Sequence, residues 1–240
     1  MWVLAIETSS SIGSVAALAP DGSVTTMKVE VAGRHGDVVV PTVRDTLERA
    51  GIGMRDVGLL AAGIGPGSFT GVRAALGVVK GLSIATSLPI SGIGSLEAMA
   101  APVLREDPGV TVLALVDARR KEVFATLIAP DGTLIVPETS GTPGAIGDAI
   151  LGSLDERTRI VVAANTDDAS LIGPIVAALG AHDTRIAPAG PPLAADVARL
   201  AAARFARGER DDVASLVPRY VRPADAKPPA PPRWSTGRTS

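Results

Sequence analysis

The chain has 240 residues and a formal net charge of −2, and 46% of its residues are hydrophobic but only 2% aromatic. This length allows one large domain or two small ones, and the near-neutral charge argues against nucleic-acid binding by the chain alone. The absence of cysteine excludes disulfides, thiol catalysis and cysteine metal sites. No apolar run is long enough to span a membrane, so we expect a cytoplasmic protein.

Strands and helices alternate in the first half. Three short runs within residues 3–31 predict a meander of strands joined by tight turns. Apolar spacing and length then predict a helix, a buried strand, a second helix, a short strand and a third helix, at 37–50, 57–62, 69–86, 88–92 and 95–104.

The second half begins like the first. LAIETSSSIGSVAALAPDG starts at Leu4, and LALVDARRKEVFATLIAPDG starts at Leu113. Glu7 in the first stretch and Asp117 in the second each precede the Asp of an APDG turn by 14 residues. This equal offset predicts an internal duplication, whereas a chance recurrence of a favourable turn sequence is the alternative. Later strands and helices are expected at 110–116, 121–129, 160–164, 169–179 and 193–207, with an extended segment at 214–221.

A glycine-rich stretch, GIGPGSFTG, connects a predicted strand to the helix at 69–86. It is not a P-loop, because no Lys follows Gly71, and its glycine spacing does not fit a dinucleotide fingerprint. An anion nest at the helix N-terminus is one interpretation. A tight structural turn is the one that the spacing favours, and it would be formed by Gly65, Pro66, Gly67, Ser68 and Gly71.

The hairpin ETSSS offers weak candidates for binding. Glu7, Thr8 and Ser9 follow the first strand, and Asp117 stands at the matching position of the second half. Such residues can hold a phosphate, or a metal through water, but a serine-rich hairpin after an acidic strand end is equally consistent with them. The two histidines, His35 and His182, are too far apart in sequence for a paired metal motif. We therefore predict no catalytic residue, metal or cofactor.

Small residues follow one face of the helix at 69–86. Gly77 and Gly81 each cost roughly 1 kcal/mol relative to Ala inside a helix, and they lie with Thr70, Ala74 and Ala85 on that face. The stripe could pack on the chain's own sheet. Because apolar residues on another face can fill that role, the pattern favours a contact with another subunit.

Several segments together resemble the bacterial TsaB (YeaZ) family over residues 1 to about 222. They are VLAIETSSSIGSVAAL, RHGDVVVPTVRDTLERAG, GIGPGSFTGVRAALGVVKGLS, VDARRKEVF and PRYVR. The resemblance implies an α/β protein with the duplicated RNase H-like fold of actin, Hsp70 and sugar kinases. It also implies kinship with TsaD, which was once classed as a glycoprotease and which transfers a threonylcarbamoyl group to adenosine 37 of tRNA.

The resemblance further implies an accessory subunit without catalytic activity. TsaD binds its metal through an H-x-x-x-H pair, but here Val39 stands where the second ligand would follow His35, and Glu7 replaces the family's usual Asp. The family binds TsaD, or a second copy, through its two N-terminal helices, a TsaE-type ATPase completes the assembly, and tRNA is met only through the complex. The implied interface contains Val39, Val43, Thr46, Thr70, Arg73, Ala74, Gly77, Lys80 and Gly81.

The chain is expected to divide into two subdomains and a tail, at residues 1–104, 105–221 and 222–240, the last being proline-rich and disordered. Two rival functions remain. A nucleotide-dependent ATPase or kinase would need an acidic pair across a cleft, for which Glu7 and Asp117 are available. A peptidase would need metal ligands or a nucleophile with its base, and no motif supplies them.

Overall fold

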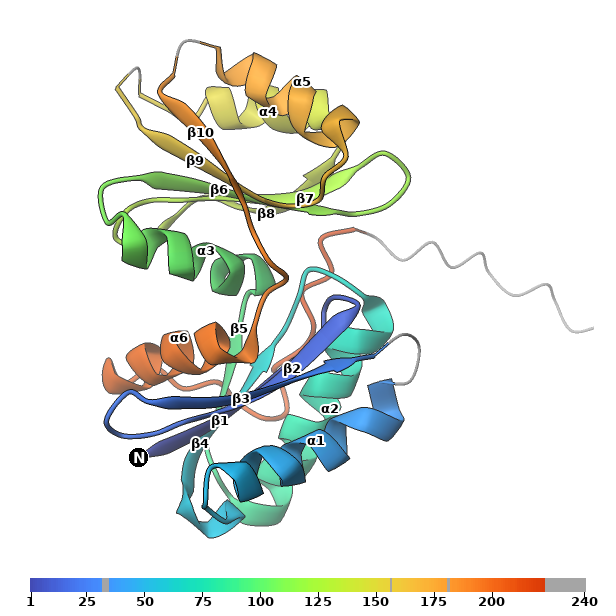
Figure 1. The fold of residues 1–240 in the computed structure, drawn as a ribbon, viewed down its shortest axis with the longest axis vertical. Helices are drawn as coiled ribbons and strands as arrows, with labels where there is room; N and C mark the ends of the chain where they lie inside the picture. Colours follow the sequence, from blue (N-terminus) through green and yellow to red (C-terminus); the bar gives the residue numbers. More distant parts are fainter. Residues whose placement is uncertain (32–34, 156, 181, 223–240) are drawn as a thin grey trace, which may run out of the picture.

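The computed structural model describes residues 1–31, 35–155, 157–180 and 182–222. Two five-stranded mixed sheets form the framework, with strand orders β3-β2-β1-β4-β5 and β10-β9-β6-β7-β8 (Figure 1). In each sheet the first three strands are antiparallel neighbours, and the first and fourth strands are parallel. None of the helices within the described ranges combines the length and the apolar character needed to cross a membrane.

Apart from a 3-10 turn in the first half, the two halves run through the same elements in the same order. The first half contains β1 (Trp2–Glu7), β2 (Ile12–Leu18), β3 (Val24–Glu30), α1 (His35–Arg49), a 3-10 turn (Met54–Asp56), β4 (Val57–Gly63), α2 (Phe69–Thr86), β5 (Ile90–Ile93) and α3 (Ser95–Glu106). The second contains β6 (Thr111–Asp117), β7 (Val123–Ile128), β8 (Leu134–Gly141), α4 (Pro143–Leu151), β9 (Ile160–Asn165), α5 (Ala169–Leu179), β10 (Thr184–Pro188) and α6 (Ala194–Ala206).

The two APDG turns have the same local structure. Gly22 and Gly132 have φ values of 88° and 86°, in the left-handed region that favours glycine. Asp21 accepts a hydrogen bond from the Ser23 amide at 2.9 Å, as Asp131 does from Thr133 at 2.8 Å. The predicted duplication is therefore confirmed, because strand order, connection order and turn geometry all repeat.

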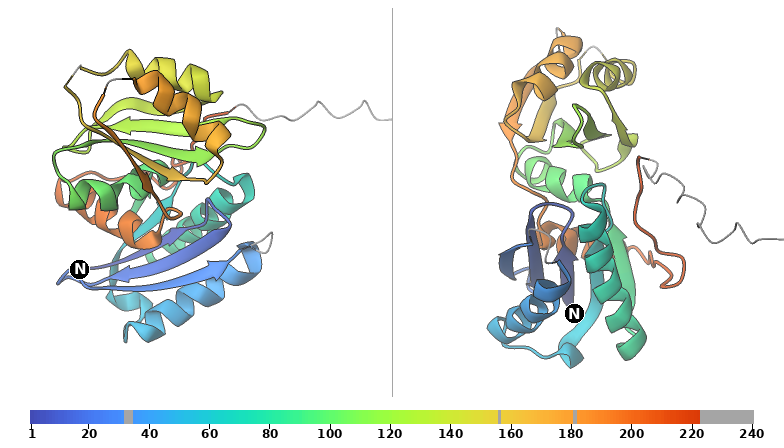
Figure 2. Two further views of the ribbon diagram at one scale, coloured as in Figure 1. Left: turned by 45° about the horizontal axis from the view of Figure 1, so that its top comes forward. Right: turned by 90° about the vertical axis from the view of Figure 1, so that its right-hand side faces the viewer.

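Alternating side chains give each sheet two packed faces. Leu4 and Ile6 of β1 face α1 and α2, whereas Val3 and Ala5 face α6. In the second sheet, Leu113 and Leu115 of β6 belong to the face that packs under α4 and α5, and the opposite face packs on α3. The layers are therefore α1 and α2, first sheet, α6 and α3, second sheet, α4 and α5 (Figures 1 and 2).

The last helix of each half packs on the sheet of the other half. α3 follows β5 but covers β6 and β9, and α6 follows β10 but covers β1, β2 and β4. We call the first sheet with α1, α2 and α6 the N-terminal lobe, and the second sheet with α3, α4 and α5 the C-terminal lobe. The predicted division at residues 104 and 221 stays a prediction, since this exchange ties the two halves together.

Some expectations differ from the structure. The sequence pattern gave no indication of β8, α4 or β10. The segment expected to be extended, residues 214–221, begins within a turn and continues without regular secondary structure. The expectation for 222–240 lies outside the described residues, except for Arg222.

Candidate functional site

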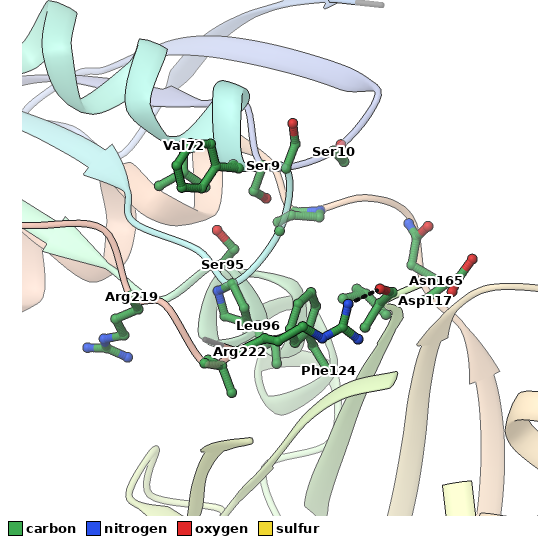
Figure 3. Close-up of a pocket in the computed structure, with 18 of the residues that line it drawn as sticks. Ser9, Ser10, Val72, Ser95, Leu96, Asp117, Phe124, Asn165, Arg219 and Arg222 are labelled. Carbon is green, nitrogen blue, oxygen red and sulfur yellow. Dashed lines mark hydrogen bonds between the residues drawn. The ribbon is translucent and has the colours of Figure 1, made fainter. Parts of the chain in front are cut away.

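A cleft of about 670 Å³ lies between the two lobes. The carboxyl ends of the parallel pairs β1–β4 and β6–β9 point toward it, which is where open α/β sheets bind ligands. Figure 3 shows Ser9 and Ser10 on one side of this cleft and Asp117 and Asn165 on the other. The two strand ends differ in what they offer to a ligand.

Glu7, the last residue of β1, is completely buried. Its Oε1 accepts a hydrogen bond from the Ser9 amide at 2.5 Å, and its Oε2 accepts one from the Ser95 hydroxyl at 2.8 Å. Burial raises the pKa of Glu7, although these hydrogen bonds act in the opposite direction. A Cβ at Gly63 would lie 1.8 Å from Oε2, so the carboxyl group occupies the space that a side chain would need there. Glu7 thus joins the hairpin to α3 and does not line the cleft.

The glycine-rich loop uses its amides within the chain. The Gly65 amide donates to the Ser95 hydroxyl at 3.2 Å, and the Ser68 amide donates to the Ser9 carbonyl at 2.7 Å. The Ser68 hydroxyl accepts from the Gly71 amide at 3.2 Å and so caps α2. Three amides that an anion nest would present are therefore already bonded, which supports the structural interpretation of this loop.

Close packing explains the glycine at position 67. A Cβ there would lie 2.4 Å from the Ser9 carbonyl oxygen. Buried Thr8 adds a further link, because its hydroxyl donates to the Gly71 carbonyl at 2.7 Å. Pro66 follows a cis peptide bond and lines the cleft. The predicted candidates Thr8 and Ser9 are thus brought together with the loop, where they join it to the hairpin.

Asp117 ends β6 and remains open to the cleft. Its side chain is 33% exposed, and its Oδ1 accepts a hydrogen bond from the Arg119 amide at 2.6 Å. Asn165 and Thr166, at the end of β9, line the same cleft. Arg119 and the two residues after it all have φ values near +60°, a conformation that is unfavourable for non-glycine residues. Glu7 and Asp117 do not form an acidic pair facing a common space.

A short segment near the C-terminus crosses the cleft and joins both lobes. We call residues 218–222 the strap. The Arg219 amide donates to the Ile64 carbonyl at 2.8 Å, and its guanidinium bonds Glu97 at 2.8 Å and Glu138 at 2.5 Å. Burial raises the pKa of Glu138, and the Arg219 charge opposes this. At the end of the strap, Arg222 bonds the Ala118 carbonyl at 3.1 Å and also the carboxylate of Glu122.

The sequence analysis missed the role of the strap. Its only signal was PRYVR, in which Arg219, Tyr220 and Arg222 are anchors spaced one or two residues apart. The partners of these residues lie 81 to 147 positions away in sequence, at Glu138, Glu122 and Arg73. Local pattern carries no information about such contacts.

Most of the predicted interface on α2 is accessible. Thr70, Arg73, Gly77 and Gly81 are exposed, whereas Ala74 and Lys80 are partly buried. A Cβ at Gly77 or Gly81 would meet no atom within 4 Å in the part of the chain that the structure describes, so packing there does not require glycine at either position. Figure 2 shows α1 and α2 together on the outer side of the N-terminal lobe.

The predicted interface residues of α1 are buried in the structure. Val39, Val43 and Thr46 are 1%, 6% and 0% exposed, because they face the first sheet, and the two valines belong to its core. A partner can meet these residues only by displacing the chain's own core. The surface of α1 is formed instead by residues such as Val40, which is 56% exposed.

Metal ligands do not gather in the part of the chain that the structure describes. Within it, no three His, Asp or Glu side chains are placed to hold an ion. The side chain of His35 lies outside the described structure.

The fold and the cleft together define a class of protein. Two lobes with repeated RNase H-like topology, enclosing a cleft at their strand ends, form the duplicated α/β fold shared by actin, Hsp70 and sugar kinases. The family model for TsaD, tRNA N6-adenosine threonylcarbamoyltransferase, matches residues 28–142.

Individual proteins are similar to this chain in sequence and in structure. A tRNA threonylcarbamoyladenosine biosynthesis protein TsaB from Escherichia coli is 40% identical over 124 residues, a match that spans 52% of this chain and about half (53%) of that relative. The TsaB protein of Bacillus subtilis is 28% identical over 230 residues, covering 95% of this chain and 96% of the relative. YeaZ from Pseudomonas aeruginosa superposes with a TM-score of 0.75 at 28% identity, covering 91% of this chain and 99% of the solved one. The chain is thus similar to proteins of the TsaB (YeaZ) family.

Proposed function

We propose that the chain is a non-catalytic partner subunit that binds and activates TsaD for threonylcarbamoyl transfer to adenosine 37 of tRNA. Relatives named for tRNA threonylcarbamoyladenosine biosynthesis support this role, and so does the match to the TsaD family within residues 28–142. The proposed subunit needs no cofactor of its own and meets tRNA only through the complex.

The exposed face of α2 carries the proposal. Gly77 and Gly81 weaken the helix by roughly 1 kcal/mol each relative to Ala, yet none of the described residues occupies the space above them. Glycines at such positions let the backbone of another helix approach closely. This face would form a heterodimer with TsaD, a second copy would compete for it, and a TsaE-type ATPase would join the assembled pair.

Reconstituted threonylcarbamoyl transfer tests the proposal. Purified TsaD and the TsaE-type ATPase are supplied with tRNA and an activated threonylcarbamoyl donor, and the modified nucleoside is measured by mass spectrometry. We expect product only when this chain is added. Equal product without the chain contradicts the activating role.

A matched pair of variants separates interface from fold. Gly77→Leu should abolish copurification with TsaD while leaving the thermal midpoint unchanged or higher. Gly173→Leu is the control, because Gly173 is also a helical glycine with nothing within 4 Å of its absent Cβ, but it lies on α5 of the other lobe. Unchanged binding by Gly77→Leu would show that the interface lies elsewhere.

A second function, nucleotide binding with ATPase or kinase activity, is favoured by one observation. The Asp117 side of the cleft is open and lies at the carboxyl ends of β6 and β9. Calorimetric titration with ATP and Mg²⁺ addresses it. Micromolar binding that is lost in Asp117→Ala would favour this rival, and no binding heat would leave the partner role as the better account.

A further inference from the structure

An arginine and two aromatic side chains form a cluster on the exposed face of α2. The Arg73 Cζ lies 3.7 Å from the ring centroid of Phe69, one helical turn before it. The Arg73 Nε donates a hydrogen bond to the Tyr220 hydroxyl at 2.7 Å, and the two rings lie 5.4 Å apart. Phe69 and Tyr220 are each 50% exposed, in a chain with only six aromatic residues. This is an unusual concentration of aromatic surface for this molecule.

The strap fixes the position of Tyr220. On one side of it, Arg219 is held by the Ile64 carbonyl and by two carboxylates. On the other side, Arg222 is held by the Ala118 carbonyl and Glu122. Tyr220 is therefore held between two anchored residues, and it in turn orients the guanidinium of Arg73.

The positive charge of Arg73 is not neutralised within the described part of the chain. No carboxylate there forms a salt bridge with Arg73, whose only hydrogen bond there is the one from Nε to Tyr220. Its two terminal nitrogens are thus left for another molecule, and a fork of N–H donors matches a carboxylate in bidentate geometry. A held guanidinium also loses less side-chain entropy when it binds.

The surrounding charges indicate what kind of molecule binds. α2 contains Arg73 and Lys80 on the same face and no acidic residue. The exposed glycines Gly77 and Gly81 continue that face and suit the close approach of a protein backbone. RNA binding would require several uncompensated cations, whereas Arg119, Arg219 and Arg222 around the cleft are paired with acidic residues.

We propose that Arg73, oriented by Phe69 and Tyr220, is a preorganised receptor for a carboxylate on an acidic helical face of a different protein chain. This inference rests on the proposed function, since it names the chemistry of the TsaD surface that α2 meets. A symmetric pairing of α2 with α2 would oppose two basic faces, so the cluster favours the heteromeric complex over a homodimer.

Titration of TsaD into the full-length chain at low and at high salt tests the proposal. Arg73→Glu should weaken binding by at least about 30-fold, the scale on which removing one member of a buried charge pair acts. Arg73→Lys keeps the charge but loses the fork, and it should weaken binding by roughly 3- to 10-fold. Tyr220→Phe removes only the hydrogen bond to Nε, and it should weaken binding about 2- to 5-fold.

The salt dependence of binding and a control variant show whether the effect is specific to Arg73. Wild-type affinity should fall as salt rises, and this dependence should be smaller for Arg73→Glu. Arg185→Glu makes the same charge change on exposed β10 of the other lobe, and it should leave affinity within about twofold of wild type. Circular dichroism melts confirm that every variant is folded.

Each alternative result has a distinct meaning. If Arg73→Glu behaves like Arg185→Glu while Gly77→Leu loses binding, Arg73 is not the receptor and the proposed function stands. If all variants bind TsaD like wild type, the α2 interface itself is wrong. If Arg73→Glu keeps TsaD but loses crosslinking to tRNA, the anion is a phosphate. If it weakens self-association but leaves TsaD binding unchanged, the carboxylate belongs to a second copy. The last three results also overturn the inference.

Discussion

The two lobes present equivalent strand ends to one cleft, but only one of them is open. Gly63 follows Ala62, which pairs with Ile6, and Thr166 follows Asn165, which pairs with Val116. The glycine leaves room for the buried Glu7 carboxyl group, whereas Thr166 lines the same cleft as the partly exposed Asp117. One duplicated motif thus has a structural role in the first half and an accessible carboxylate in the second.

This difference teaches that an acidic residue at a strand end is not by itself a ligand site. Glu7 has both oxygens occupied by Ser9 and Ser95, so it connects the hairpin, β4 and α3. The N-terminal side of the cleft has therefore become a rigid support beneath α2. In the proposed function, that support places the partner-binding face.

Gly63→Ala should have the largest effect. The added Cβ would lie 1.8 Å from the Glu7 carboxyl group, which has no free space to move into. We expect a loss of at least about 3 kcal/mol in the free energy of unfolding, at the upper end of overpacking effects. Thr166→Ala, at the equivalent position, should cost under about 1 kcal/mol. Denaturant unfolding compares the two, and equal effects would contradict the described asymmetry.

Glu7→Ala should destabilise by about 2 to 4 kcal/mol, because it leaves a cavity and two buried donors without an acceptor. Asp117→Ala should cost less than about 1 kcal/mol, since its carboxylate is partly exposed and its main partner is a turn amide. Thermal melts of the two variants give the comparison. A larger loss for Asp117→Ala would reverse our assignment of the structural and the open end.

Acidification should stabilise the protein through Glu7. Burial raises its pKa in the folded state above the unfolded value of 4.5, so between the two values the folded state binds more protons. This contribution is fully present below the unfolded pKa and is lost as pH rises through the folded pKa. Glu7→Gln should remove it, as measured by unfolding curves across that window.

Asp131 in the other lobe provides a control of opposite sign for the effect of pH. Its hydrogen bonds from Thr133 lower its pKa, so its contribution is present above the unfolded pKa and is lost as pH falls through the folded pKa. As the pH falls, the free energy of unfolding of wild type should therefore decrease relative to that of Asp131→Asn. It should increase relative to that of Glu7→Gln. The same trend in both variants would contradict the raised pKa of Glu7.

Lys121→Gly should have the smallest effect, an increase of roughly 0.5 kcal/mol in the free energy of unfolding. Its φ of 61° costs a non-glycine residue about 1 to 2 kcal/mol, and the greater freedom of glycine in the unfolded chain offsets part of that gain. Ser10→Gly in the matching hairpin should not stabilise, because Ser10 has no positive φ. Chemical denaturation measures whether the variant is more or less stable than wild type. A lower free energy of unfolding for Lys121→Gly would show that the Lys121 side chain stabilises the turn.

The sequence predicted the elements with strong local patterns. The equal spacing of Glu7 and Asp117 from the APDG turns indicated the duplication, and the apolar spacing placed α2 at 69–86 as observed. It missed β8, where Pro137 interrupts an edge strand, and the short elements α4 and β10.

The site was less predictable than the fold. The burial of Glu7 depends on Gly63 and Ser95, and the orientation of Arg73 depends on Tyr220, 147 residues away. The burial of Val39, Val43 and Thr46 was not predictable, because helical spacing does not say which face of α1 meets the sheet, and their place in the interface stays a prediction. The family resemblance supplied the proposed function, which no local pattern contained.

The central claim is that α2 presents a glycine face for a partner rather than for the chain's own core. Measuring both the affinity for TsaD and the free energy of unfolding of Gly77→Ala tests it most directly. We predict a chain about 1 kcal/mol more stable, because alanine favours helix and meets no neighbour, together with clearly weaker TsaD binding. A variant that gains stability and binds TsaD as tightly as wild type would contradict the claim.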